Sequence, residues 1–201
     1  DRIWRKKAVK ELQPLNPKKI LDIATGTGDF AIASMKLEPE EIIGIDISNG
    51  MLEVGREKMR KKKIDHIITM TQADSEDLPF ESDYFDGLTV GFGVRNFENL
   101  NKGLAEMLRV LKPGGKAVIL EFSKPKKFPV KQSFNFYSKY IIPVLGKGIS
   151  KDEKAYAYLP ESVEAFPEGV EFEDILKKLN YKDVKSSLVS GGIATIYTGV
   201  K

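Results

Sequence analysis

The 201-residue chain contains no cysteine and only one histidine, His66. Without thiols this sequence can form neither a disulfide framework nor a thiolate metal site, and one imidazole cannot make a histidine metal cluster. We therefore predict that no metal takes part, and the composition suits the reducing cytoplasm. His66 stands in the polar approach to a strand, so we expect it to be exposed and to have no part in catalysis.

The sequence also lacks a large excess of one charge and long apolar runs. The 32 Lys and Arg residues and the 29 Asp and Glu residues give a formal net charge of +3 and are spread along the chain. We therefore expect no nucleic-acid partner. No run of 18 apolar residues and no apolar signal region occur, which predicts a cytoplasmic protein without a membrane span. The chain begins at Asp1 inside a helix-like stretch without a methionine, so we expect N-terminal residues to be missing.

Apolar residues cluster into seven segments of strand length, with helical stretches between them. This alternation is expected of a parallel sheet rather than of a bundle or a sandwich. We predict strands over residues 19–24, 42–46, 67–72, 85–90, 116–122, 183–188 and 193–200, and helices over 29–37, 49–62, 100–111 and 171–179. Residues 1–201 are therefore predicted to form one doubly wound α/β domain, with helices on both faces of a mostly parallel sheet. The turn Lys112-Pro113-Gly114-Gly115 is predicted to end a helix and lead into the fifth strand.

A glycine-rich turn, Thr25-Gly26-Thr27-Gly28, lies between the first strand and the next helix. Glycine lets a backbone approach a ligand where a Cβ atom would collide, and it tolerates positive φ. The same spacing also fits a dinucleotide loop or a tight turn without a ligand, so the turn alone does not decide. Asp22 favours a cationic, phosphate-free cofactor, because its carboxylate would repel a pyrophosphate and can help to hold an ammonium group.

Acidic residues also follow the second and third strands. Asp46 can accept hydrogen bonds from both hydroxyls of a ribose, as it would in an NAD-binding protein. Asp74 can accept one from an adenine amino group or, alternatively, cap the next turn. Taken together with the Lys-Pro-Gly-Gly turn, these positions resemble the class I S-adenosylmethionine-dependent methyltransferases. That resemblance implies their fold, S-adenosylmethionine as cofactor and S-adenosylhomocysteine as product. The implied cofactor contacts are Asp22, Thr25, Gly26, Thr27, Gly28, Asp46, Ile47, Met51, Asp74 and Ser75.

Four segments give a narrower resemblance, to the ubiquinone/menaquinone biosynthesis C-methyltransferase family. They are residues 109–123, with Lys-Pro-Gly-Gly at their centre, residues 92–97, residues 121–125 and residues 158–162. Members of this family methylate a ring carbon of a polyprenylated quinol. The chain departs from the family in lacking the Tyr-Asp segment that precedes Trp4-Arg5, and in having Gly91 where some relatives have a serine that contacts the cofactor.

The resemblance implies methylation of demethylmenaquinol, and residues 190–194 favour this menaquinone type. One alternative is the benzoquinol step of ubiquinone synthesis, and another is a catalytically silent cofactor-binding subunit of a quinone-synthesis assembly. A small-molecule or RNA methyltransferase is disfavoured, because no basic groove and no Asn/Asp-Pro-Pro-aromatic motif occur. The oligomeric state stays open, with a homodimer as one expectation.

Methylation of a quinol carbon needs a phenolate beside the attacked carbon, because only then is the ring electron-rich. Arg95 follows the fourth strand, whose carboxyl end faces the ligand crevice of such a sheet. Its guanidinium can stabilise the oxyanion without losing a proton. The alternative is an ion pair of Arg95 with a glutamate such as Glu98 or Glu121. Asn96 can position the ring oxygen or a bridging water, or simply shape the turn.

Residues 124–163 are predicted to cover the substrate. Their aromatic and aliphatic residues exceed what a simple connection needs, as an isoprenoid tail would require. Tyr137, Tyr156 and Tyr158 are expected to contact the quinol, with simple packing as the alternative. Lysines at 124, 126, 127 and 131 can rest on anionic lipid, which would give a peripheral membrane contact, or can form a solvated basic loop.

Overall fold

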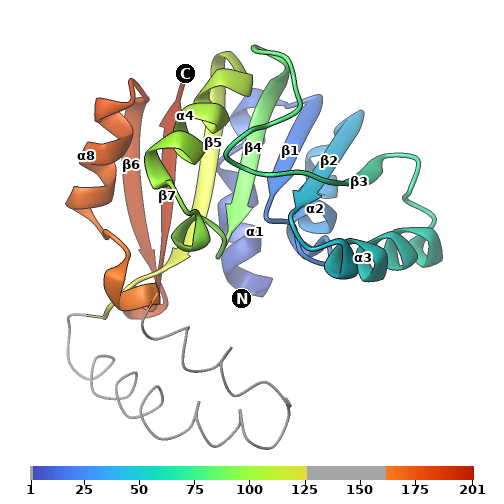
Figure 1. Cartoon of the computed structure of the whole chain (residues 1–201), viewed down its shortest axis with the longest axis horizontal. Coiled ribbons are helices and arrows are strands. Elements are labelled where there is room, and N and C mark those ends of the chain that lie inside the picture. The colour runs from blue at the N-terminus through green and yellow to red at the C-terminus, as the bar shows by residue number, and fades with distance from the viewer. Residues whose placement is uncertain (1, 126–161) are drawn as a thin grey trace, which may run out of the picture.

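A seven-stranded sheet forms the centre of the computed structural model, which describes residues 2–125 and 162–201 (Figure 1). The strands lie in the order β3-β2-β1-β4-β5-β7-β6. The parallel strands are β1 (Lys19–Ile23), β2 (Glu41–Asp46), β3 (Ile68–Gln72), β4 (Phe85–Gly91) and β5 (Leu111–Phe122). β7 (Ala194–Val200) runs antiparallel to both of its neighbours, β5 and β6 (Lys182–Val189). The predicted mostly parallel sheet of seven strands is confirmed.

Helices cover both faces of this sheet, as predicted. α4 (Leu100–Val110) and α8 (Val170–Lys178) pack on one face, and α1 (Arg2–Lys10), α2 (Asp29–Ser34) and α3 (Asn49–Lys62) pack on the other. In Figure 1, α4 stands in front of the sheet while α1 and α2 lie behind it. The described residues also contain the 3₁₀ turns η1 (Gln13–Leu15), η2 (Met35–Leu37), η3 (Val94–Asn96) and η5 (Ser190–Gly192).

The apolar side chains of the strands point to both faces of the sheet, which explains why both faces need helices. In β1, Leu21 and Ile23 join the cluster under α4 and α8, whereas Ile20 joins the cluster under α2 and α3. All three side chains are fully buried. Because successive residues of a strand point to opposite faces, a strand that is apolar on both faces must lie between two helical layers.

One prediction about local structure is wrong: the Lys-Pro-Gly-Gly turn does not precede β5 but lies inside it. β5 starts at Leu111, which is buried and pairs with Phe85, while Lys116 pairs with Gly87. The intervening residues form a bulge in the ladder. Gly114 has φ +81, and a Cβ on Gly115 would come within 3.1 Å of the Asp86 carbonyl oxygen. The strand begins early because pairing and burial of Leu111 end α4 at Val110.

The predicted substrate cover falls largely on residues 126–161, so Tyr137, Tyr156 and Tyr158 lie outside the described residues. Within the described ranges, no helix is both long and apolar enough to cross a membrane.

Candidate active site at the carboxyl edge of the sheet

The carboxyl ends of β1 to β4 meet along one edge of the sheet, the lower edge in Figure 1. Loops that follow parallel strands gather at this edge, and ligands of open α/β sheets bind there. The glycine-rich turn follows β1, Asp46 ends β2, Asp74 follows β3, and Arg95 follows β4. The structure therefore brings all the described site residues that the sequence predicts to one edge.

Asp22 is fully buried beneath the glycine-rich turn. Its Oδ2 accepts hydrogen bonds from the Thr25 hydroxyl at 2.5 Å and from the Ala31 backbone N–H at 3.0 Å, and its Oδ1 accepts one from the Thr89 hydroxyl at 2.7 Å. Ala31 lies in the first turn of α2, where backbone N–H groups have no partner within the helix. Asp22 therefore joins the turn, the start of α2 and β4.

Burial raises the pKa of Asp22 from 3.8 to about 6, against the opposing effect of its three hydrogen bonds. The carboxylate is thus mostly ionised at neutral pH and places a negative charge under the turn. The structure gives Asp22 an organising role that the sequence did not predict. Its attraction for the ammonium group of a cofactor stays a prediction.

The backbone of the glycine-rich turn has little room. Gly28 has φ +81, and a Cβ there would lie 2.2 Å from the terminal methyl group of Met59. Gly26 has φ +56. Lys58 of α3 donates to the Thr27 hydroxyl at 2.7 Å and to Asp29 at 3.0 Å, which ties the turn to α3. Both glycines therefore meet the conformational requirement from which they were predicted.

Asp46 faces the same turn from the end of β2. Its Oδ2 accepts from the Gly26 N–H at 2.8 Å, and its Oδ1 accepts from the Ser48 N–H at 2.9 Å. An ionised carboxylate offers about four acceptor positions, so each oxygen keeps capacity for one more donor. Two adjacent hydroxyls of a ribose match that capacity.

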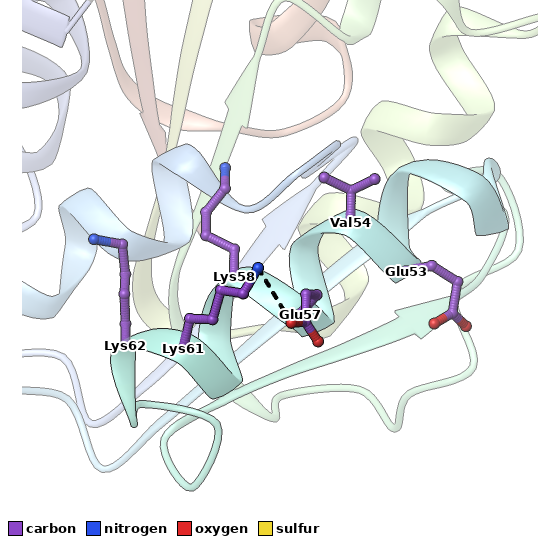
Figure 2. Close-up of a pocket in the computed structure, with 6 residues that line it drawn as sticks. All are labelled: Glu53, Val54, Glu57, Lys58, Lys61 and Lys62. Atoms are coloured by element: carbon purple, nitrogen blue, oxygen red, sulfur yellow. Dashed lines mark ion pairs between the residues drawn. The ribbon is translucent and has the colours of Figure 1, made fainter.

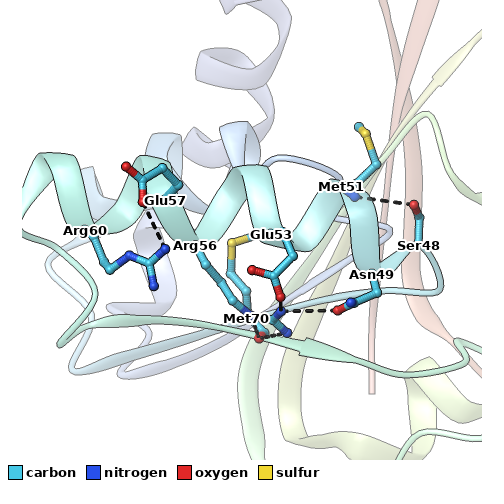
Figure 3. Close-up of polar contacts among 8 residues, drawn as sticks. All are labelled: Ser48, Asn49, Met51, Glu53, Arg56, Glu57, Arg60 and Met70. Atoms are coloured by element: carbon cyan, nitrogen blue, oxygen red, sulfur yellow. Dashed lines mark hydrogen bonds and ion pairs between the residues drawn. The ribbon is translucent and has the colours of Figure 1, made fainter.

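Two large apolar side chains beside Asp46 are left in solvent. Ile47 is 73% exposed and Met51 is 44% exposed. Met51 stands in the first turn of α3, whose N-cap is Ser48, and projects away from the helix (Figure 3). Farther along α3, Arg56 donates to the Met70 carbonyl oxygen at 3.0 and 2.9 Å and so ties the helix to β3. Apolar surface held in place at the edge suits the flat face of a nucleobase.

Asp74 and Ser75 follow β3 at the same edge. Asp74 is exposed, and its Oδ1 accepts from the Glu76 N–H at 2.9 Å. The Ala73 N–H donates to the Asp46 carbonyl oxygen at 3.2 Å, which sets this loop beside β2. The turn-capping alternative for Asp74 is therefore present in the structure, and adenine recognition by Asp74 and Ser75 stays a prediction.

A hollow lies on the outer side of α3, lined by Glu53, Val54, Glu57, Lys58, Lys61 and Lys62 (Figure 2). None of the predicted site residues lines it. His66, after this helix, is exposed as expected. Within the ranges that the structure describes, no group of three or more His, Cys, Asp or Glu side chains could hold a metal ion.

Arg95 forms the ion pair that the sequence offered as its alternative. Its Nη1 donates to Glu121 Oε1 at 2.7 Å and also to the carbonyl oxygen of Phe92. The Arg95 side chain is 10% exposed and the Glu121 side chain is fully buried. The Nε atom is buried and, among the described residues, has no hydrogen-bond partner. The guanidinium therefore keeps an unsatisfied donor at the site edge.

Burial raises the pKa of Glu121, and the positive charge of Arg95 opposes that rise. Asn96 is the exposed last residue of η3, and its N–H donates to the Gly93 carbonyl oxygen. Its predicted catalytic role stays a prediction.

Three aromatic residues near Arg95 were not predicted as site residues. The rings of Phe92 and Phe122 lie 4.4 Å apart, and Trp4 of α1 lies 6.2 Å from Phe92. The Arg95 guanidinium carbon lies 5.4 Å from the Phe122 ring centroid, within range of a cation–π contact. Phe92 has φ +58, which is uncommon for a bulky residue. A Phe after a strand gives no warning of this conformation, so the sequence alone could not reveal the cluster.

Thr89 was also missed, although the sequence carries a usable signal. It pairs directly with Asp22 in the register of β1 and β4. Both are polar residues flanked by apolar ones, both are fully buried, and a buried polar group needs a partner.

Several solved structures with a similar fold are described as S-adenosylmethionine-dependent methyltransferases. One from Thermotoga maritima has a TM-score of 0.67 at 18% identity and matches 100% of this chain and 89% of its own. One from Aquifex aeolicus has a TM-score of 0.67 at 17% identity, with coverage of 98% and 89%. The phosphoethanolamine N-methyltransferase 2 of Haemonchus contortus, in complex with S-adenosyl-L-methionine, also has a TM-score of 0.67, at 18% identity, and matches 92% of this chain and 48% of its own. The fold is that of the class I methyltransferases.

Sequence relatives narrow this class to one family. The demethylmenaquinone methyltransferase of Bacteroides fragilis is 50% identical over all of this chain and 82% of its own length. The ubiquinone/menaquinone biosynthesis C-methyltransferase of Geobacter sulfurreducens is 44% identical, covering 100% and 79%. The model of the ubiE/COQ5 methyltransferase family matches residues 1–201. The chain belongs to the ubiE/COQ5 methyltransferase family, and it is a methyltransferase.

Proposed function

We propose that this chain transfers the methyl group of S-adenosylmethionine to a ring carbon of demethylmenaquinol, giving menaquinol. The observation that carries the choice of substrate is the 50% identity, over the whole chain, to the demethylmenaquinone methyltransferase of Bacteroides fragilis. The benzoquinol precursor of ubiquinone is the alternative substrate.

The residues at the carboxyl edge fit S-adenosylmethionine, whose bound sulfonium supplies the electrophilic methyl group. Asp46 would hold the ribose hydroxyls with the acceptor capacity that Gly26 and Ser48 leave free. Ile47 and Met51 would lie against the adenine, which would cover their exposed apolar surface. The backbone at Gly26 would lie along the methionine part, with the charge of Asp22 beneath it.

Arg95 is the residue we assign to the quinol. A phenol has an ordinary pKa near ~10, so a site that works near neutrality must stabilise the phenolate. A guanidinium does so without being deprotonated, and in an enclosed place its charge is weakly screened. The Nε donor is buried and has no partner among the described residues, so we assign it to a substrate oxygen or to a bridging water.

The direct test uses the full chain with isotopically labelled S-adenosylmethionine and, in separate reactions, reduced demethylmenaquinone and the reduced methoxybenzoquinone precursor. Mass spectrometry should find the label on the ring carbon of the naphthoquinol product. Label on the benzoquinol alone would overturn the choice of substrate. Cofactor binding without labelled product from either quinol would favour the silent-subunit alternative.

A further inference from the structure

The Glu121 carboxylate contacts Arg95 in two places. Oε1 accepts from Arg95 Nη1 at 2.7 Å, and Oε2 is 3.4 Å from the Arg95 backbone nitrogen. Oε1 also accepts from the Phe122 N–H at 2.9 Å, so the carboxylate is itself fixed at the end of β5. One buried side chain therefore restrains both the guanidinium and the turn that carries it.

The contacts of the guanidinium show which of its nitrogen atoms lacks a partner within the described part of the protein. Nη1 uses its two N–H groups on Glu121 and on the carbonyl oxygen of Phe92. The buried Nε has no partner among residues 2–125 and 162–201. The Phe122 ring, 5.4 Å from the guanidinium carbon, supports the group from one side. Nη1 is thus committed to the protein, and Nε is the guanidinium donor that lacks a partner within those ranges.

We propose that Glu121 is a positioning residue for methyl transfer, which acts by holding Arg95 with its Nε donor toward the quinol oxygen. This inference rests on the proposed function, because it takes Arg95 as the group that contacts the substrate. Removal of a buried charge leaves its partner unpaired at high cost. Without the Glu121 carboxylate, Arg95 would turn toward solvent, and its donors would no longer be directed at the substrate.

A second ion pair of the same length provides a comparison. Arg109 and Glu106 on α4 lie 2.7 Å apart and also bind backbone groups of residues 78 and 80. Their contacts join α4 to the loop before β4 and involve none of the predicted site residues. Glu106→Gln therefore removes an ion pair of equal length without changing Arg95.

The test is a double-mutant cycle on the turnover number kcat with reduced demethylmenaquinone. Arg95→Ala should lower kcat by about 10²- to 10³-fold, the usual cost of removing one group that stabilises an oxyanion. Glu121→Gln should lower it by at least ~10-fold, with little change in the Kd of S-adenosylmethionine. The double variant should be no slower than Arg95→Ala, because residues that act as a unit are not additive. Glu106→Gln should stay close to the parent kcat.

Chemical rescue separates positioning from a general structural role. Millimolar guanidinium should restore part of the turnover of Arg95→Ala, because Glu121 can bind the added cation in the vacated place. It should fail to rescue the double variant. Rescue of both variants to the same extent would contradict the proposed role of Glu121.

The negative results distinguish a failure of the role of Glu121 from a failure of the role of Arg95. If Arg95→Ala is slow but Glu121→Gln turns over like the parent, or if the two effects multiply in the double variant, Glu121 has no positioning role and the proposed function stands. If Arg95→Ala itself turns over like the parent, the role of Arg95 in the proposed function fails. Should Glu121→Gln not fold, Glu121→Asp keeps the charge one methylene farther away and should still lower kcat by at least ~10-fold, since geometry is what it disturbs. A parent-like kcat of Glu121→Asp would overturn the inference.

Discussion

Asp46 is the residue that we assign to the ribose of the cofactor. Its two oxygens order the backbone at Gly26 and Ser48 and would also accept the ribose hydroxyls. Asp46→Ala should therefore weaken S-adenosylmethionine binding by about 10- to 100-fold, since a charged acceptor is worth ~1.5 to 3 kcal/mol. Titration calorimetry measures this loss, with NAD, which should give no saturable heat, as the control ligand. Unchanged affinity in a folded variant would remove Asp46 from the site.

Asp22 should make the free energy of unfolding depend on pH. Its pKa is about 6 in the folded protein against an ordinary 3.8, so between these values the folded state binds more protons than the unfolded state. The contribution of Asp22 to the free energy of unfolding is therefore highest below about pH 4 and falls as pH rises through about 6. The full change is roughly 3 kcal/mol.

Asp22→Asn should remove this dependence, because an amide does not titrate. Urea unfolding of parent and variant across about pH 4 to 7 provides the measurement. The stability of the variant relative to the parent should rise with pH over that interval. Two parallel stability curves would show that Asp22 titrates in the folded state as it does in the unfolded chain.

At the scale of elements, the bulge in β5 makes Gly115 sensitive to substitution. A Cβ there would lie 2.9 Å from the Lys112 carbonyl oxygen and 3.1 Å from that of Asp86, and neither backbone atom can move freely. Gly115→Ala should lower the free energy of unfolding by about 1 to 3 kcal/mol, as overpacking does.

Gly50→Ala is the matched control for this substitution. Gly50 lies in the first turn of α3, and a Cβ there meets nothing within 4 Å. Alanine should leave stability unchanged or raise it by up to ~1 kcal/mol, because its helix propensity exceeds that of glycine. Equal effects of the two substitutions would show that the bulge is not tightly packed.

The order of elements could be predicted because periodicity and turn residues change at each boundary. The short run of buried residues in β1 and the helical spacing of α3 leave clear patterns in the sequence. The start of β5 could not be predicted, since Lys-Pro-Gly-Gly has the composition of a free turn. Only the pairing of Leu111 with Phe85 across the sheet reveals a bulge.

In the candidate site, too, some residues could be predicted from the sequence and others could not. Asp46 and the glycine-rich turn follow from their places after strands, because parallel strands bring such places together. The Arg95–Glu121 pair joins residues 26 positions apart. From the sequence, this ion pair was an alternative to a catalytic role for Arg95, with Glu98 as another possible partner. Choosing between them requires the positions of side chains, and the left-handed backbone of Phe92 likewise depends on its surroundings.

At the scale of the whole molecule, one edge of the sheet serves two purposes. The ends of β1, β2 and β3 carry the residues assigned to the cofactor. The end of β5 carries Glu121, which is proposed to position Arg95, and Arg95 follows β4 and is assigned to the quinol. β1 and β4 are neighbours in the sheet. The donor of the methyl group and its acceptor would therefore meet above the β1–β4 junction, which provides the closeness that methyl transfer requires.

The redox state of the substrate gives the most direct test of this account. Only the quinol can form the phenolate that makes the attacked carbon electron-rich, and only a phenolate needs the Arg95 donors. Under anaerobic conditions, with labelled S-adenosylmethionine, the full chain should methylate reduced demethylmenaquinone and leave the oxidised form unlabelled. Equal rates of methylation of the two forms would contradict the account.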